Sequence, residues 1–335
     1  MKVTQSSAYR LMNTNLDRIT TTLQDLRSQA ATGLKLNKPS DDPTAVRPVL
    51  TTRTQMRHTD RYLDTMGVSL DKMQATDGHL EHVETIMQRA KEIAINAANG
   101  SLNDFDRTVL ADEISHLRRE LLDVANAQVD GKHIFAGYSE NTLPFIENTA
   151  YDPATYDPTN SNTWPFLYQG DANPTELEIT PGELLTVNTT GNDIFLGIAN
   201  SNWVDSATPA LNQPESGRID LFSVLTRTEE AIRANNMDDP AGAGGGIEAN
   251  IDNLEMSADQ NRRLRSQLGN RARRVETAMM HQEDVKVDLE MILSRYQDAD
   301  IVETFNEIVQ QETTFQAALN VTARISNISI LDYFQ

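Results

Sequence analysis

Residues 5–31, QSSAYRLMNTNLDRITTTLQDLRSQAA, decide how the fold begins, because their apolar side chains recur in steps of three and four. The row consists of Tyr9, Met12, Leu16, Ile19, Leu23, Leu26 and Ala30. Residues 301–319, IVETFNEIVQQETTFQAAL, repeat the spacing at Ile301, Phe305, Ile308, Phe315 and Leu319, with polar Glu312 at one position of the row. Such heptad rows predict helices with one apolar side. The two ends are therefore predicted to be helical arms that cover each other or the arms of neighbouring copies.

Loops separate these arms from the rest of the chain. Gly33 is a suitable C-terminal glycine for the first arm, and residues 297–300 precede the second. Amphipathic helices usually pack within their own bundle, but this separation favours packing of the arms between subunits. The predicted assembly residues are Met12, Leu16, Ile19, Leu23, Leu26, Ile301, Phe305, Ile308, Phe315 and Leu319.

Two long helices are predicted between the arms, over residues 44–99 and 247–296. Asp42 can cap the first of them and Pro43 fits its first turn, whereas Pro48 is expected to kink or break it near its start. Both would be roughly 75–80 Å long, which predicts antiparallel partners in a rod. Shorter helices over about 104–128 and from Asp220 complete a four-helix bundle. The apolar row of the second long helix is interrupted at Asn261, Arg265, Gln282 and Lys286.

The composition changes abruptly over residues 139–217, which contain no Lys or Arg but eight of the twelve prolines and both tryptophans. Residues 176–180 alternate polar and apolar side chains like a strand, Pro181-Gly182 indicates a turn, and residues 184–187 indicate a second strand. Residues 188–192 are predicted to be another turn. The segment is thus predicted to be a β-rich, acidic domain inserted between helices.

The predicted fold is mainly α: an elongated antiparallel helical bundle or rod with terminal coiled-coil arms and an inserted small β-rich domain. The arms would comprise residues 1–43 and 297–335. The rod would comprise residues 44–138 and 218–296, and the outer domain residues 139–217.

Composition narrows the possible functions. The net charge of −20 argues against a nucleic-acid partner, because phosphate binding needs a basic surface. The absence of cysteine rules out disulfides and thiolate chemistry. We expect no Sec signal peptide at the start and no membrane insertion, since no apolar run approaches the roughly 20 residues that span a bilayer.

Few residues suggest chemistry. The stretch His79-Leu80-Glu81-His82, with Glu84, lacks the spacing of a zinc protease and is expected to be a polar helix flank. The run Gly242–Gly246 lacks the spacing of a phosphate-binding loop and is expected to be a hinge. We therefore predict no catalytic residue, cofactor or metal, and expect a protein that is not an enzyme.

Several stretches resemble the flagellin superfamily, and within it the junction proteins between hook and filament. Residues 26–42, LRSQAATGLKLNKPSDD, resemble the end of the family's first helix, and RAKEIAINAANGSL at 89–102 resembles the end of its long helix. DGKHIFAGY at 130–138 resembles the exit from the junction proteins' helical domain. Further similar motifs are Pro144-Phe145, Tyr168-Gln169-Gly170-Asp171, Ile179-Thr180-Pro181-Gly182, Gln267-Leu268-Gly269 and Asp298-Ala299-Asp300.

This resemblance implies an extracellular structural protein, exported through the flagellar apparatus without a Sec signal. It implies a ring of subunits between the hook-associated protein on the hook side and flagellin, and an export chaperone on the C-terminal helix. Three alternatives stay open: a short filament-forming flagellin, an exported carboxylate-dependent hydrolase acting through residues 139–217, and a coiled-coil scaffold inside the cell.

Overall fold

The computed structural model describes residues 5–99, 102–204, 212–237 and 245–333, without the side chains of residues 5, 6, 8, 9 and 324–333. The chain forms two compact units. The terminal unit comprises residues 1–60 and 283–335, and the central unit comprises residues 61–282. The division into arms, rod and outer domain stays a prediction, because the two long helices contribute residues to both units.

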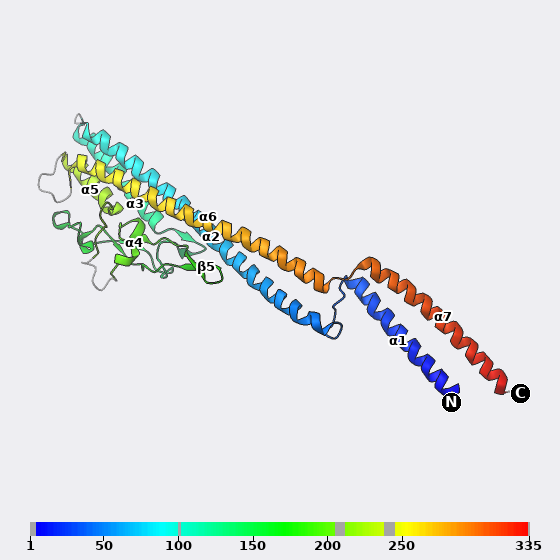
Figure 1. Ribbon diagram of the computed structural model, residues 1–335. Coiled ribbons are helices and arrows are strands. Elements are labelled where there is room, and N and C mark those ends of the chain that lie inside the picture. The colour runs from blue at the N-terminus through cyan, green and yellow to red at the C-terminus, as the bar shows by residue number, and fades with distance from the viewer. Residues whose placement is uncertain (1–4, 100–101, 205–211, 238–244, 334–335) are drawn as a thin grey trace. The chain divides into compact units, whose positions relative to one another are not determined.

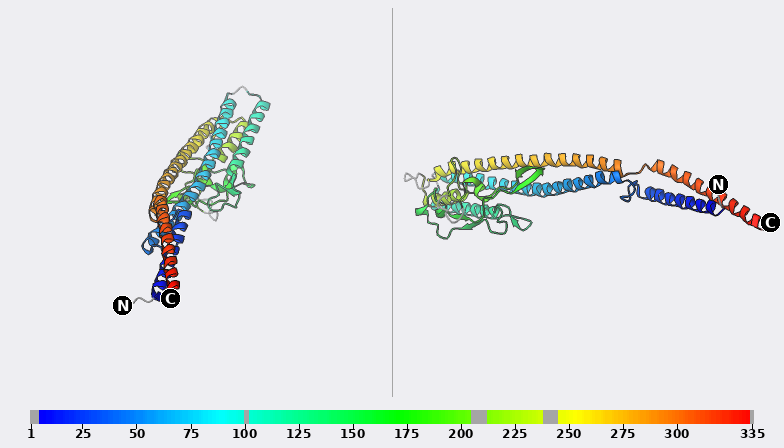
Figure 2. Two further views of the ribbon diagram at one scale, coloured as in Figure 1. Left: turned by 90° about the vertical axis from the view of Figure 1, so that its right-hand side faces the viewer. Right: turned by 60° about the horizontal axis from the view of Figure 1, so that its bottom comes forward.

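In the terminal unit, helix α1 (Gln5–Thr32) and helix α7 (Ile301–Tyr333) lie side by side and antiparallel (Figure 1 and Figure 2). Helix α1 ends at Gly33, whose φ of 72° is the left-handed conformation that glycine adopts without strain. The carbonyl of Gly33 accepts a hydrogen bond from Ala299 N at 2.9 Å, and Lys35 N donates to Gln297 O at 2.8 Å. These bonds join the end of α1 to the segment that leads into α7.

Helix α2 (Pro43–Ala98) starts as predicted but continues through Pro48. Asp42 Oδ1 accepts hydrogen bonds from Thr44 N at 2.9 Å and from Ala45 N at 3.2 Å, which caps the first turn. Of the kink or break predicted at Pro48, the break does not occur. Pro48 lies in the second turn, where it removes one helical hydrogen bond, and the helix continues past it.

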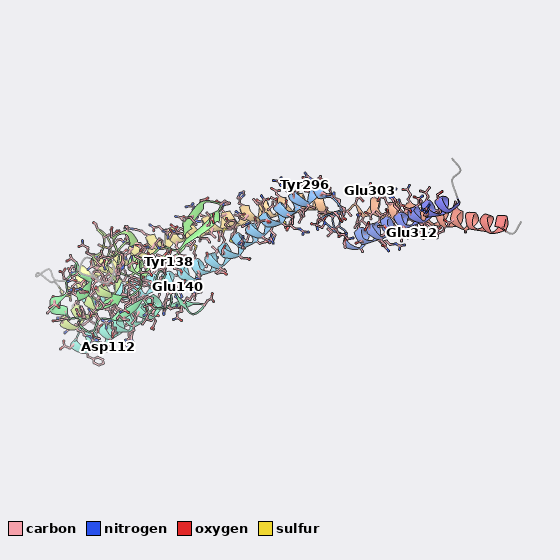
Figure 3. The ribbon with its side chains drawn as sticks, turned by 90° about the horizontal axis from the view of Figure 1, so that it is seen from below. Asp112, Tyr138, Glu140, Tyr296, Glu303 and Glu312 are labelled. Atoms are coloured by element: carbon pink, nitrogen blue, oxygen red, sulfur yellow. The ribbon has the colours of Figure 1, made fainter. Side chains whose placement is uncertain are left out.

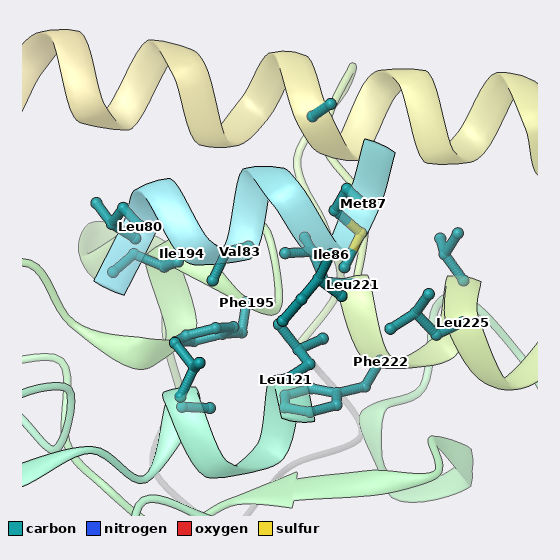
Figure 4. Packing of buried hydrophobic residues seen from close by; sticks show 14 of the residues in the cluster. Leu80, Val83, Ile86, Met87, Leu121, Ile194, Phe195, Leu221, Phe222 and Leu225 are labelled. Carbon is teal, nitrogen blue, oxygen red and sulfur yellow. The ribbon is translucent and has the colours of Figure 1, made fainter. Parts of the chain in front are cut away.

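In the central unit, α2 and α6 (Ile247–Gln297) are antiparallel, with α3 (Asp104–Ala125) and α5 (Leu221–Ala234) packed beside them. Figure 4 shows how side chains from these helices meet. Leu80, Val83 and Met87 of α2 pack in one cluster with Leu121 of α3 and Leu225 of α5. The two long helices and the two shorter ones therefore share a core, as the apolar rows predict.

Four polar residues interrupt the apolar row of α6, and each of them bonds to a neighbouring element. Three of the partners are on α2 and one is on a strand. The contacts are Asn261 Nδ2 to Leu80 O at 2.6 Å, Arg265 Nε to Asp77 Oδ1 at 3.1 Å, Gln282 Nε2 to Ile179 O at 3.5 Å and Lys286 Nζ to Asp60 Oδ1 at 2.8 Å. The interruptions therefore lie at the helix interface and tie α6 to its neighbours.

Residues 128–204 form small antiparallel hairpins rather than one continuous sheet. The pairs are β1 (Gln128–Val129) with β2 (Lys132–His133), β3 (Phe145–Glu147) with β4 (Phe166–Tyr168), and β5 (Glu176–Thr180) with β6 (Glu183–Thr186). Short helical turns follow the strands: η1 (Pro153–Thr155), η2 (Ser161–Thr163), α4 (Gly191–Ile194) and η3 (Asn200–Asn202). The predicted strands and the turn at Gly182 are confirmed, whereas the turn predicted at residues 188–192 runs into helix α4.

An aromatic cluster joins these hairpins to the helices. Phe222 of α5 stacks on Phe166 of β4, with ring centroids 4.5 Å apart, and lies 5.1 Å from Phe145 of β3. Phe135 and Phe195 meet edge to face at 5.2 Å. Because these rings belong to the same buried cluster as the α2 and α6 side chains, residues 139–217 share the core of the helices.

Basic side chains from outside the segment neutralise part of its acidity. Arg274 of α6 lies 2.8 Å from Glu183, and Arg218 lies 2.7 Å from Asp193. Residues 139–217 contain no Lys or Arg, so their carboxylates obtain cationic partners from flanking elements. Some of the acidic side chains thus help to attach the segment to its flanking elements.

Candidate assembly surface

The two arms meet through a small apolar seam in the terminal unit. Leu23 and Leu26 of α1 are buried with Ile308 of α7, and Ile19 and Phe315 pack against them. The seam brings together half of the ten predicted assembly residues within a single chain. Within one chain, then, these arms cover each other along part of their length.

The polar position in the α7 row has a specific partner. Glu312, labelled in Figure 3, lies 2.7 Å from Arg27 of α1. Both side chains are about half exposed, so the pair contributes only about 0–1 kcal/mol. Its effect is to favour this register of the two arms over others.

The other predicted residues lie away from the centre of the seam. Met12 and Leu16 are half-buried, whereas Ile301, Phe305 and Leu319 are exposed. Their contact with a partner stays a prediction. Tyr9 is outside the described side chains.

A second apolar row on α7 was missed by the sequence analysis. Val302 is 73% exposed, and Val309 is exposed with it on the same side as Phe305. The spacing of three and four residues from 302 to 309 indicates this row in the sequence as well as the row through Ile308. Helix α7 therefore has one apolar side against α1 and another that is uncovered in the single chain.

Exposed apolar side chains are concentrated in the terminal unit. This unit has about a third of the residues but more than half of the large apolar side chains that are exposed in the described part of the chain. They are Leu11, Leu50, Val287, Met291, Ile292, Tyr296, Ile301, Val302, Phe305, Val309, Leu319 and Val321. This concentration makes the helices of the terminal unit the candidate surface for partners.

The residues weighed for metal binding have other roles. His79 contacts the ring of Phe135 edge to face, with centroids 6.5 Å apart, and burial lowers its pKa. His82 Nε2 lies 2.9 Å from Glu120, and Glu84 faces Arg265 at 3.0 Å. Among the residues that the structure describes, no group of His, Asp and Glu has the arrangement of a metal site.

The carboxylates around a cavity of about 360 Å³ are also engaged by neighbours. Glu229 lies 2.7 Å from Arg118 Nη1, and Glu230 accepts a hydrogen bond from the Tyr151 hydroxyl at 3.0 Å. Burial raises the pKa of Glu230. These pairs connect α3, α5 and the segment 139–217, so we assign them a structural role.

Asp220 is a buried carboxylate at the start of α5. Its side chain accepts hydrogen bonds from Phe222 N and Ser223 N, both at 3.1 Å, which caps the helix. Burial raises the pKa of Asp220 to about 7, although the hydrogen bonds from Ser223 and the helix backbone act in the opposite direction. The environment explains the shift without a catalytic role.

None of the described helices is long and apolar enough to cross a bilayer.

Residues 3–140 match the model of the bacterial flagellin N-terminal helical region. Along its length the chain is 25% identical over 308 residues to flagellar hook-associated protein 3 of Escherichia coli, covering 90% of each chain. It is 23% identical to the protein of the same name from Salmonella typhimurium, covering 91% of this chain and 90% of the relative. The chain resembles flagellar hook-associated protein 3. The resemblance inferred from the motifs is thereby confirmed.

Solved structures support the same fold. A flagellar hook-associated protein from Vibrio parahaemolyticus matches 77% of this chain and all of its own, with a TM-score of 0.59 and 16% identity. FlgL of Xanthomonas campestris matches 72% of this chain and 98% of its own, with a TM-score of 0.53 and 17% identity.

A flagellin from Halalkalibacterium halodurans is also similar in sequence, being 22% identical over 83% of this chain and 93% of its own.

Proposed function

We propose that this chain is a structural subunit that connects the flagellar hook, through the hook-associated protein on the hook side, to the flagellin filament. The observation that carries the proposal is the similarity to hook-associated protein 3 over nine-tenths of both chains. The uncovered apolar side chains of the terminal unit agree with it, because a junction subunit needs surfaces for unlike neighbours. The subunit would thereby be required for filament assembly and motility.

Deletion of the chain from its bacterium tests this function. We expect hooks without filaments, flagellin released into the medium and loss of swimming, all restored by the full-length chain. A version that ends before Ile301 should not restore filaments, although the central unit keeps its own core. Normal filaments in the deletion strain would refute the proposal, and incorporation of the shortened chain at the wild-type level would refute the role of α7.

A filament-forming flagellin is the second candidate, supported by the flagellin from Halalkalibacterium halodurans, which matches 83% of this chain. The two candidates differ in self-assembly. A flagellin should polymerise into long filaments as a purified protein, whereas a junction subunit should not do so without its partners. Sedimentation of the concentrated chain, followed by electron microscopy, distinguishes them.

The protein would leave the cell through the flagellar export apparatus without a Sec signal and function at the hook–filament junction. Before export, a chaperone would cover α7, where Val302, Phe305 and Val309 form an apolar row that otherwise favours aggregation. Titration of the chaperone with wild-type and Val309→Asp protein tests this role, and equal affinity for the two would contradict it.

A further inference from the structure

Two outward surfaces of the terminal unit have opposite charge and a similar apolar centre. The first, here called the acidic face, is on α6 and consists of Glu283, Asp284, Val287, Asp288, Glu290 and Met291, all of them exposed. Val287 and Met291 are 54% and 56% exposed and lie one helical turn apart. Acidic residues flank them on both sides. Lys286, the basic residue within this stretch, turns away toward Asp60 at 2.8 Å.

The second surface, here called the basic face, is on the first turns of α2 and consists of Arg47, Leu50, Thr54 and Arg57, all of them exposed. Leu50 is 57% exposed at its centre. Residues 43–59 contain no Asp or Glu. The acidic residues that bound this stretch have other partners, because Asp42 caps the helix and Asp60 pairs with Lys286. Arg57 Nη2 donates to Thr54 Oγ1 at 3.3 Å, which holds the guanidinium along this face.

The two faces do not cover each other within one chain. The side of α2 opposite the basic face carries buried Val49 and Thr52, and the side of α6 opposite the acidic face carries buried Leu289. Every residue of the two charged faces is exposed, so neither face is covered by the other helix. A single copy therefore presents an acidic surface in one direction and a basic surface in another.

We propose that the acidic face of one copy docks on the basic face of a second copy of this chain. Charge complementarity selects this occupant: the apolar residues Val287, Met291 and Leu50 would be covered while carboxylates meet guanidinium groups. Since the two patches differ, the contact is heterologous, and repetition of it produces a ring or a helical array rather than a closed dimer. The inference rests on the proposed function, which brings many copies to one place.

Cysteine cross-linking tests the pairing directly, because the chain has no cysteine of its own. Leu50→Cys, Val287→Cys and the double variant would each replace the native chain, and isolated flagella would be treated with a short bis-maleimide. The double variant is expected to produce a ladder at multiples of 37.3 kDa. Each single variant should stay monomeric, and co-expression of the two should stop at dimers. Leu50→Cys combined with Leu184→Cys, an exposed position in the central unit, is the matched control and should produce no ladder.

Three results would overturn the proposal: a single variant that cross-links to itself, a double variant that cross-links only to a protein of another size, or wild-type incorporation of the double variant without cross-links. Absence of the wild-type chain from flagella would instead refute the proposed function. If the double variant itself fails to incorporate into flagella, variants with reversed charges test the pairing instead. Arg47→Glu with Arg57→Glu, or Asp284→Arg with Asp288→Arg, should each reduce flagellin retention about tenfold, because attraction becomes repulsion at each exposed pair. The two pairs combined should restore retention, and failure to restore it in variants with wild-type helicity would refute the pairing.

Discussion

Replacement of Phe222 by alanine tests whether residues 139–217 depend on the helices for their stability. The Phe222 side chain is fully buried, stacks on Phe166 and contacts Phe145. It belongs to α5, whereas its two partners belong to the hairpin of β3 and β4. Its removal therefore opens a cavity at the boundary between the hairpins and the helices.

The expected loss is about 3–5 kcal/mol of unfolding free energy, the range for a buried phenylalanine whose surroundings only partly collapse. The aromatic stacking places Phe222 toward the upper part of that range. For a unit of this size, each kcal/mol lowers Tm by roughly 2–4 °C, so the variant should melt about 10 °C lower. The matched control is Phe105→Ala, because Phe105 is 75% exposed and its loss should change stability by less than about 0.5 kcal/mol.

Two spectroscopic signals separate the possible outcomes. Trp164 and Trp203 are the chain's two tryptophans and both belong to residues 139–217, so fluorescence follows that segment. Far-ultraviolet circular dichroism follows the helices. A shared core requires both transitions to shift together in Phe222→Ala. A shift in fluorescence alone, or a loss below about 1 kcal/mol, would refute the inference that the segment and the helices fold as one unit.

Burial raises the pKa of Asp220 from its ordinary 3.8 to about 7, so the folded state prefers the protonated acid. The free energy of unfolding therefore falls as the pH rises between these two values. Asp220→Asn should therefore remove most of the decline in urea-unfolding free energy between about pH 5 and about pH 8, at most about 3 kcal/mol. An unchanged decline would contradict this assignment. Ile308→Asp should separate α1 from α7 and increase proteolysis of both arms, because Ile308 is buried in their seam. Val309→Asp, on the exposed side of α7, should leave proteolysis unchanged but reduce incorporation into flagella, and equal behaviour of these two variants would contradict the two-sided arrangement of α7.

Local chemistry made most helix boundaries predictable. Asp42-Pro43 starts α2, Gly33 ends α1, and Asp220 caps α5, because each residue type satisfies backbone groups that a helix end leaves unpaired. At Pro48 the predicted break does not occur, because packing of the remaining turns retains a helix that an isolated proline disfavours.

The elements that pack against each apolar face were harder to predict from the sequence. The apolar rows predicted that α2 and α6 pack together, but they did not show that Phe222 would join β3 and β4 to that core. Likewise, the seam residues of α1 and α7 were recognisable, whereas the second apolar side of α7 depends on which side α1 covers. Periodicity identifies a face of a helix, but the partner that covers it is a property of the folded chain.

Asn261 shows why polar residues at predicted core positions are informative. Its Nδ2 donates to Leu80 O at 2.6 Å, while its buried Oδ1 has no hydrogen-bond partner within the described residues. Asn261 therefore lowers the stability of the fold. It also favours registers of α2 and α6 that place a carbonyl within hydrogen-bond distance of its Nδ2, as a single buried asparagine does in coiled coils.

Replacement of Asn261 by leucine is expected to raise the unfolding free energy by about 1–2 kcal/mol, because an unpaired buried oxygen is removed and apolar area is added. The same change at exposed Asn270 should have little effect. The variant should also populate alternative registers, visible as less specific cross-linking between cysteines placed at Asp77 and Arg265, which face each other at 3.1 Å in the native register. A destabilised variant would show instead that the hydrogen bond to Leu80 outweighs its desolvation. Greater stability with unchanged cross-linking would show that the register does not depend on Asn261, and that contacts such as the Lys286–Asp60 ion pair fix it.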